Sequence, residues 1–394
     1  MTKIPFNRPP EASRELEYLV EVLRTRRLGG GGTFTRGCET WLEAAIGSPR
    51  VLLTTSCTAA LEMAAMLAGI GPGDEIIMPS FTFPSTANAF VLRGATPVFV
   101  DIREDTLCID EAAIEDAINE HTRAIVPMHY GGVGAEMGRI MEIAKARGLI
   151  VIEDAAQALC ARHDGRPLGS FGELAALSFH ESKNIVCGEG GALLINDPSL
   201  IERAVIIRDK GTDRQKFFDR QVDKYTWVDI GSSYTPSELL SAFLLAQLEE
   251  AEAITARRRA AWGLYHAMLE GFEEAGLLRR PIIPPTAAEH SAHIYYVLVP
   301  TEEQRSLVLT SLADLGISAT FHYSPLHAAA AGRRFGKVSG SLVNTEELAP
   351  RLIRLPLYAN IKPEDQMRVV EALGLVLGER ERPHERLRRP SRGA

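Results

Sequence analysis

From about residue 50 onward, short apolar runs rich in β-forming residues alternate with stretches of helical periodicity. Strands that are apolar on both sides are typical of a parallel sheet covered by helices on both faces. The sequence therefore predicts an α/β protein with a mostly parallel sheet of about seven strands, sandwiched by helices. The expected strands are Val51–Thr54, Glu75–Met78, Pro97–Ile102, Ala124–Met128, Leu149–Glu153, Ala175–Phe179 and Ala192–Ile195. The expected helices between them include Ala59–Ala68, Glu111–Asn119, Glu136–Ala146 and Leu200–Ile207.

The length of the chain indicates more than one folding unit. A single hydrophobic core seldom organises 394 residues, so two domains are expected. We predict a large αβα domain over residues 1–250 and a smaller α+β domain over residues 251–377. Residues 378–394 are polar, basic and contain proline, which is typical of a disordered tail. The structured segments expected in the smaller domain are His293–Val299, Ser306–Asp314, Thr320–Tyr323 and Pro363–Leu377.

The composition argues against several functional classes. The net charge of −8 argues against a general nucleic-acid-binding surface. The five cysteines are odd in number and form no C-x-x-C pair, so reduced thiols in a cytoplasm are expected. The sequence has neither an apolar signal core nor a run of about 18 apolar residues, so we expect a soluble protein without a membrane partner. No metal is expected, because His180-Glu181 does not continue as H-E-x-x-H.

Polar residues that follow the expected strands are the candidates for a site, because ligands bind beyond the carboxyl ends of parallel strands. Ser56, Cys57 and Thr58 follow the first strand and precede a helix. Their side chains and the unpaired amides of the first helical turn would bind an anion such as a phosphate. Simple N-capping explains the same residues equally well. Phe83, after the second strand, either stacks on a flat cofactor or packs in the core.

Two later strand ends add a carboxylate and a lysine. Asp154 follows the strand that ends at Glu153, and it is either the partner of a protonated ring nitrogen or a helix N-cap. Lys183 lies in LAALSFHESKNIVCGEGG, between an apolar strand and a glycine cluster, with Ser178 and His180 on the approach to it. A lysine in this position is a candidate Schiff-base nucleophile, although isolated lysines are usually solvated.

The order of these residues predicts a cofactor. A phosphate anchor, an aromatic ring, a carboxylate for a ring nitrogen and a lysine are the parts that a pyridoxal phosphate site requires. Four unrelated structural explanations would have to coincide to produce the same series. We therefore predict a pyridoxal 5′-phosphate (PLP) enzyme in which Lys183 and Asp154 are catalytic.

From about Ile4 to Leu377 the chain also resembles the DegT/DnrJ/EryC1/StrS family of sugar-nucleotide aminotransferases. This resemblance implies the fold of the fold-type I PLP-dependent aminotransferases. Within the family it is strongest to the branch that makes dTDP-4-amino-4,6-dideoxygalactose. The segments that carry the resemblance are, in order, IPFNRPP, FTRGCETWLE, VLLTTSCTAALEMAA, EIIMPSFTF, STANAFVLRGATPVFVDIR, TRAIVP, EDAAQ, SFHESKN, GEGG, KGTDR, QVDKYTWVDIGSSY, FHYSPLH and RLPL.

The resemblance assigns roles around the cofactor ring. Lys183 would form the Schiff base with PLP and carry protons, and Asp154 would bind the pyridinium nitrogen. Gln157 would bind the phenolic oxygen, and Phe83 would stack on the ring.

Other residues are implied to hold the cofactor's phosphate, namely Cys57, Thr58 and Ser178, with Ser56 beside them. Many family members reach the neighbouring subunit's phosphate with a G-x-N-x-R-M segment. Here residues 231–236 read GSSYTP, so Ser233 takes the place of the asparagine. The same G-S-S-Y is typical of the branch named above.

The reaction implied by the resemblance is transamination at C4 of a dTDP-4-keto-6-deoxyhexose with L-glutamate as amino donor, in a cytoplasmic homodimer. Alternatives are amination at C3, PLP-dependent dehydration, and a non-catalytic PLP-binding regulator. Dehydratases of the family carry histidine in place of the lysine, which favours transamination. The sequence leaves the galacto or gluco configuration of the product open. Candidate substrate-binding residues are His180, Lys210, Arg214, Lys224, His322, Tyr323 and His327.

Overall fold

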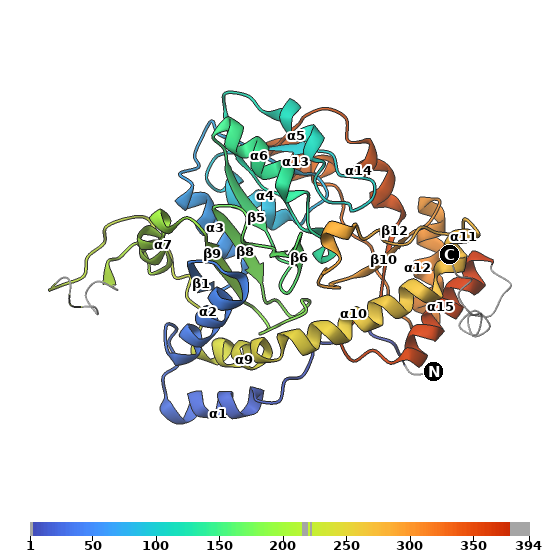
Figure 1. The fold of residues 1–394 in the computed structure, drawn as a ribbon, viewed down its shortest axis with the longest axis horizontal. Coiled ribbons are helices and arrows are strands. Elements are labelled where there is room, and N and C mark those ends of the chain that lie inside the picture. The colour runs from blue at the N-terminus through green and yellow to red at the C-terminus, as the bar shows by residue number, and fades with distance from the viewer. Residues whose placement is uncertain (1–2, 215–219, 221–222, 379–394) are drawn as a thin grey trace.

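The computed structural model describes residues 3–214, 220 and 223–378, and its body is built on an eight-stranded sheet (Figure 1). The strand order is β1-β9-β8-β5-β4-β2-β3-β11. Every neighbouring pair is parallel except the two that involve β9, which runs antiparallel to both β1 and β8. The strands are β1 (Arg50–Thr54), β2 (Glu75–Pro79), β3 (Thr96–Val100), β4 (Thr122–Ile125), β5 (Ile150–Asp154), β8 (Leu174–Ser178), β9 (Gly191–Ile195) and β11 (Lys337–Val338).

Helices cover both faces of this sheet because the strands are apolar on both sides. In β1, for example, Val51 and Leu53 pack into one hydrophobic core, whereas Leu52 packs into the other. The first core includes residues of α2 (Thr33–Ile46), α5 (Glu111–Ala117), α6 (Met137–Arg147) and α9 (Glu238–Glu249). The second core includes residues of α3 (Cys57–Leu67), α4 (Pro84–Val91) and α7 (Ile201–Arg208). The predicted sandwich architecture is therefore confirmed.

A third core lies in the C-terminal part of the chain. The antiparallel pair β10 (Tyr295–Leu298) and β12 (Leu352–Leu355) packs with α10 (Ala251–Met268), α12 (Glu302–Asp314) and α15 (Pro363–Leu377). Ile4 from the N-terminal arm belongs to the same core, while α1 (Glu15–Thr25) packs along α9. The chain passes from α9 to α10 at residue 250, where we placed the domain boundary, and that boundary stays a prediction. Shorter elements are α11 (Glu270–Glu274), α13 (Ala330–Phe335), α14 (Val343–Leu348), β6 (Arg162–His163) and β7 (Arg166–Pro167).

The seven predicted strands are confirmed within a few residues at each end, and α15 spans the predicted segment Pro363–Leu377. The prediction missed β11 and β12, and it was wrong in treating Thr320–Tyr323 as one regular segment. Only Thr320 pairs there, in an isolated bridge with Arg354. Residues 379–394 lie outside the described residues. Within the described part of the chain, no helix has the length and apolar character needed to span a bilayer.

Candidate active site

One edge of the sheet gathers the carboxyl ends of its parallel strands, as predicted. β5 ends at Asp154 and β8 ends at Ser178. Because β9 is antiparallel, its first residue, Gly191, reaches the same edge and pairs with both Thr54 and Ser178. Residues far apart in the chain thus meet beyond this edge.

Lys183 lies in a tight turn directly after β8. The turn is closed by hydrogen bonds from the Lys183 amide to the His180 carbonyl (2.9 Å) and from the Cys187 amide to the Phe179 carbonyl (2.8 Å). Burial lowers the pKa of the Lys183 amine below its ordinary value, partly offset by Asp154 and reinforced by the charge of Arg354. A lowered pKa increases the fraction of neutral amine, which is the nucleophilic form.

Asp154 is buried and held by two neutral donors. The Thr86 hydroxyl donates a hydrogen bond of 2.6 Å to Oδ2, and the Ala156 amide donates one of 3.2 Å to Oδ1. A second hydroxyl, that of Thr82, lies 2.8 Å from Thr86 Oγ1. Neither of these two hydrogen-bond donors is a cation, so the carboxylate is a suitable partner for a cationic group such as a protonated ring nitrogen.

The start of α3 lies at this edge, where we predicted an anion site, and that role stays a prediction. The Ser56 side chain is the N-cap and accepts from the Ala59 amide at 3.1 Å, so the capping alternative is correct for this residue. Cys57 and Thr58 open the helix, where amides have no intrahelical acceptor. Burial raises the pKa of the Cys57 thiol well above its usual range, so the thiol stays neutral and adds no negative charge.

Gly191 allows β9 and the start of α3 to approach each other closely. A Cβ at this position would lie 2.3–2.5 Å from backbone atoms of Ser56 and Cys57. Only glycine therefore allows β9 to pass directly beneath the start of α3.

Two aromatic side chains and Gln157 form one wall of the site. Phe83 precedes α4 and is 57% exposed, so its ring is not used in the core and is available for stacking. Its ring lies 6.4 Å from that of Tyr323. Gln157 donates to the Tyr323 hydroxyl at 2.8 Å and accepts from the Gly131 amide at 2.7 Å.

His322 extends this wall. Its ring stacks on Tyr323 with the centroids 4.0 Å apart. Burial lowers the pKa of His322 to about 2, so the ring is neutral. Its Nε2 accepts a hydrogen bond from Arg354, and its Nδ1 lies 3.3 Å from the Tyr130 hydroxyl. Since Nε2 is an acceptor, the ring proton is on Nδ1 and is donated to Tyr130.

The side chains of two predicted histidines contact other polar residues. His327 lies between Ser80 (2.7 Å) and Glu346 (3.2 Å). The His180 ring lies 2.9 Å from the Ser182 hydroxyl and 3.8 Å from Glu189. The roles of both histidines in substrate binding stay predictions.

The remaining predicted site residues lie in the long loop after α7. Lys210 and Arg214 pair with Asp209 at 3.0 and 4.0 Å, and Ser233 forms an isolated bridge with Asp209. Lys224 is exposed. The described parts of this loop project away from the body of the molecule (Figure 1), so their assigned roles stay predictions.

Sequence reasoning missed Thr86, Tyr130, His293 and Arg354. His293 Nδ1 lies 3.0 Å from Oδ1 of Asn184, the residue after Lys183, so it helps to hold the lysine turn. A signal was present for Arg354 alone, since it is a charged residue within the apolar run LIRLPL. The other three sit in segments whose pattern does not distinguish them from core residues.

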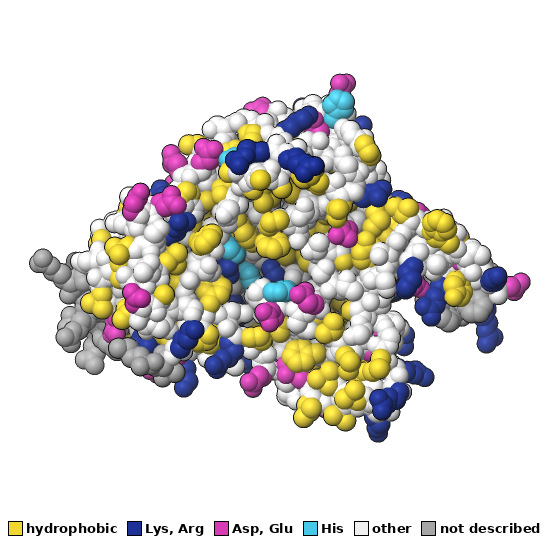
Figure 2. All heavy atoms as spheres, turned by 180° about the vertical axis from the view of Figure 1, so that it is seen from behind, with side chains coloured by type: hydrophobic (Ala, Val, Ile, Leu, Met, Phe, Trp, Pro, Cys, Tyr) yellow, Lys and Arg dark blue, Asp and Glu magenta, His cyan; other side chains and the backbone are white. Residues whose placement is uncertain are grey.

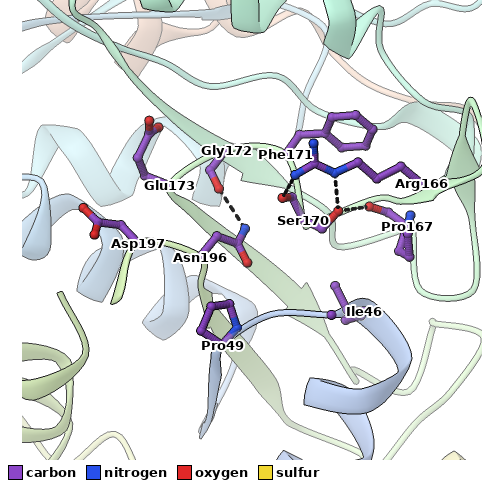
Figure 3. Close-up of a pocket in the computed structure, with 11 residues that line it drawn as sticks. Ile46, Pro49, Arg166, Pro167, Ser170, Phe171, Gly172, Glu173, Asn196 and Asp197 are labelled. Atoms are coloured by element: carbon purple, nitrogen blue, oxygen red, sulfur yellow. Dashed lines mark hydrogen bonds between the residues drawn. The ribbon is translucent and has the colours of Figure 1, made fainter. Parts of the chain in front are cut away.

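Two hollows of the surface differ in the side chains that line them. On the face shown in Figure 2, histidine and basic side chains gather at the floor of a central hollow. A second hollow, of about 590 Å³, lies at the opposite ends of the strands, beside Glu173 and Asn196 (Figure 3). There Asn196 donates to the Gly169 and Gly172 carbonyls, and Glu173 accepts from the Val151 amide. These polar groups support the backbone rather than facing a ligand.

Comparisons with known proteins agree with this geometry. The model of the DegT/DnrJ/EryC1/StrS aminotransferase family matches residues 9–374. The chain belongs to this family. The aminotransferase is 32% identical over 379 residues to the spore coat polysaccharide biosynthesis protein SpsC of Bacillus subtilis (strain 168), covering 94% of this chain and 96% of SpsC.

Solved structures give the same result. TlmJ, an aminotransferase from Streptoalloteichus hindustanus, is 30% identical, with a TM-score of 0.86 over 95% of this chain and 99% of its own. The putative sugar aminotransferase Spr1654 from Streptococcus pneumoniae, in its PLP form, is 25% identical, with a TM-score of 0.87 over 96% of this chain and 99% of its own. This aminotransferase therefore has the fold-type I architecture, and its cofactor is PLP. Its own residues fit that cofactor, because a neutralisable lysine, a free carboxylate and a helix start lie along one sheet edge.

Proposed function

We propose that this aminotransferase moves the amino group of L-glutamate to C4 of a dTDP-4-keto-6-deoxyhexose. The products would be 2-oxoglutarate and a dTDP-4-amino-4,6-dideoxyhexose. The observation that carries the proposal is that the turn holding Lys183 follows β8 at the same sheet edge where β5 ends in Asp154 and α3 begins. The sugar-nucleotide substrate is supported by the segments shared with the C4 branch, such as FHYSPLH and GSSY, and by the polysaccharide pathway named for SpsC.

Different residues of the chain would have different roles in this reaction. When bound, PLP supplies an electron sink for the negative charge that develops at the substrate carbon. Lys183 would take the proton from Cα of the donor and later return one, for which a lowered amine pKa is an advantage. Asp154, oriented by Thr86, would hold a proton on the ring nitrogen. Tyr323 and His322 would close the side of the site that Lys183 faces.

We also propose that the enzyme is a cytoplasmic homodimer with sites at the interface. The loop after α7 exposes four large apolar side chains, which a second copy would cover. These are Tyr225, Trp227, Val228 and Ile230. The loop is anchored at its far end, where the Tyr234 carbonyl accepts from the Thr55 amide at 2.8 Å.

The reaction is tested with purified enzyme, dTDP-4-keto-6-deoxyglucose and L-glutamate, with NMR of the sugar product. A new amine at C4 supports the proposal, and the ring coupling constants distinguish galacto from gluco. An amine at C3, or loss of a hydroxyl without amination, would replace it with one of the two enzymatic alternatives. Bound PLP that never exchanges with glutamate would indicate a regulator. Lys183→Ala is expected to abolish turnover.

A further inference from the structure

The short segment around His293 is fixed against the site by hydrogen bonds on two sides. On one side, the Ser291 amide donates to the Gly132 carbonyl at 3.2 Å, and the Ser291 hydroxyl donates to the Gln157 carbonyl at 2.6 Å. On the other side, the buried guanidinium of Arg258 donates to the His293 carbonyl at 2.6 Å. The position of the His293 ring is therefore set by its backbone before any ligand binds.

The side chain of Asn184 assigns a different role to each nitrogen of this ring. Asn184 Nδ2 donates to the Ser291 carbonyl at 2.8 Å, which leaves Asn184 Oδ1 facing His293 Nδ1 at 3.0 Å. A carboxamide oxygen only accepts, so the ring proton is on Nδ1 and is donated to Asn184. Burial lowers the pKa of His293 well below its ordinary value, so the ring is neutral and Nε2 is an unprotonated acceptor.

His293 and Lys183 border a common space. Asn184, which holds the ring, directly follows Lys183 in the chain. Lys183, Asn184 and His293 line the same hollow of about 10 Å³, together with other residues that include Gln157 and Ser178. His293 is only 5% exposed, so its Nε2 has little access to solvent.

The free acceptor on the ring matches a free donor on the lysine. Within the described part of the chain, Nε2 of the ring has no hydrogen-bond donor. Buried acceptors are almost always paired, so a donor in the same hollow is expected. The carboxamide of Gln157 donates to Tyr323 at 2.8 Å, and that of Asn184 donates to Ser291. The Lys183 amine, with two or three protons to donate, has no acceptor among the described residues and therefore fits Nε2.

We propose that His293 orients the Lys183 amine, an inference that rests on the role proposed for Lys183 above. Asn184 holds the Nδ1 proton, and Nε2 accepts a hydrogen bond from the amine whenever the amine is not bonded to the cofactor. With one N–H directed at Nε2, the lone pair of the neutral amine is turned towards Cα of the amino donor. After the amine has taken the Cα proton, the resulting ammonium still donates to Nε2 and is held in place until it returns a proton. His293 is thus a positioning residue, and no proton passes to its ring.

Two substitutions separate the two ring nitrogens. The carboxamide nitrogen of His293→Asn lies near the place of Nδ1, so it keeps the bond to Asn184 but leaves nothing at Nε2. The longer side chain of His293→Gln reaches the place of Nε2 with an acceptor oxygen but loses the bond to Asn184. A purely structural role for the ring predicts that His293→Asn is the milder change, whereas orientation of the lysine through Nε2 predicts that His293→Gln is milder for proton transfer.

The measurement is the reaction of the holoenzyme with L-glutamate alone, followed by rapid mixing through the absorbance of the cofactor, with normal and Cα-deuterated donor. His293→Asn is expected to lower the rate at saturating glutamate about 3- to 10-fold, the value of one hydrogen bond. It is expected to increase the deuterium isotope effect, with no change in the half-saturating glutamate concentration or in the urea midpoint. His293→Gln is expected to react faster than His293→Asn and to unfold at lower urea.

His290→Asn is the matched control. His290 lies on the same segment, but its Nδ1 accepts from the Ala292 amide at 3.2 Å and its ring packs against Trp262, with the centroids 4.7 Å apart. This variant is expected to keep the wild-type rate and isotope effect with glutamate.

The inference is overturned if His293→Asn keeps the wild-type rate and isotope effect, or if His293→Gln reacts more slowly than His293→Asn. Borohydride reduction of the wild-type holoenzyme, followed by peptide mass spectrometry, identifies the lysine that holds the cofactor. A lysine other than Lys183 would overturn the inference and the proposed role of Lys183 together. The expected results with glutamate, combined with amination at another sugar carbon, would support the inference and refute the proposed C4 reaction.

Discussion

The Thr86 hydroxyl donates a 2.6 Å hydrogen bond to Oδ2 of Asp154, which links the third residue of α4 to the end of β5. This bond, with that from the Ala156 amide to Oδ1, fixes the orientation of the carboxylate. Thr86 thus acts as a positioning residue through Asp154.

Removing this hydroxyl should impair the enzyme without unfolding it. Thr86→Val is expected to lower kcat/KM for L-glutamate about tenfold or more, because a hydrogen bond to a charged group is lost. Thr86→Ser keeps the hydroxyl and should restore most of the activity. The absorption spectrum of the bound cofactor as a function of pH reports the Asp154 interaction independently. An unchanged spectrum in Thr86→Val would contradict the positioning role.

The pKa of Lys183 should respond in opposite directions to its two charged neighbours. Asp154 raises it and Arg354 lowers it. Asp154→Asn should therefore decrease the pKa further, whereas Arg354→Gln should increase it towards the ordinary lysine value. The rate of acetylation of Lys183 in the cofactor-free protein, followed by peptide mass spectrometry across pH, measures both shifts. A shift in the same direction for both variants would refute the assigned geometry.

Gly191→Ala should weaken phosphate binding and stability together. The new methyl group would meet the backbone of Ser56 and Cys57 at 2.3–2.5 Å, and overpacking of this kind costs roughly 1–3 kcal/mol. The midpoint of urea unfolding and the dissociation constant for PLP are the two measurements. Gly263→Ala is the control, because a Cβ there has nothing within 4 Å. That change lies inside α10, and equal or higher stability is expected from it.

The stability of the protein should fall as the pH drops below about 6.5. Burial lowers the pKa of His290 to about 4 and that of His322 to about 2. Between those values and the ordinary histidine pKa, the unfolded chain binds protons that the native chain does not, so acid favours unfolding. Each histidine contributes a slope of up to about 1.4 kcal/mol per pH unit.

Urea unfolding at several pH values between 5 and 8 measures this slope. His290→Asn should flatten it, whereas His121→Asn should not, because His121 is exposed at the surface. Equal slopes in the wild type and in His290→Asn would show that His290 does not contribute.

Trp227 should report the proposed subunit contact. It is 80% exposed in the single chain, and Leu375 is 78% exposed on α15. Trp227→Glu is expected to shift a dimer towards monomer in sedimentation experiments and to lower activity, while Leu375→Glu should do neither. A wild-type protein that sediments as a monomer would refute the interface outright.

The sequence was sufficient to predict the sheet and to single out Asp154 and Lys183 as candidate residues, whose roles stay predictions. Strands buried on both faces leave continuous apolar runs, and Asp154 and Lys183 stand out as charges placed directly after such runs. β11 was missed because it has only two residues and is exposed, so it leaves no pattern. Thr86 was missed because a threonine in a helix becomes significant only when the partner of its hydroxyl is known.

The other residues near Lys183 are brought there by contacts between segments that are far apart in the sequence. His293 and Arg354 come from the C-terminal part of the chain and approach Lys183 only because β10 and β12 pair. The loop after α7 was assigned to substrate binding from its charges, yet Lys210 and Arg214 pair with Asp209 within the loop itself. Local sequence does not reveal whether a charged side chain pairs with its neighbour or with a ligand.

The insertion of β9 between β1 and β8 also sets an order for folding. Among the described residues, the only strand that pairs with β1 in the sheet is β9, so this early strand must wait for a segment made much later. Such distant pairing carries a high loop-closure entropy and slows folding. Pulse-labelling hydrogen exchange should therefore show β1 amides gaining protection together with those of β9 and later than those of β2 and β4. On this route the cofactor pocket is among the last parts of the molecule to form. A nascent chain could therefore not bind PLP until β9 has paired with β1 beneath α3.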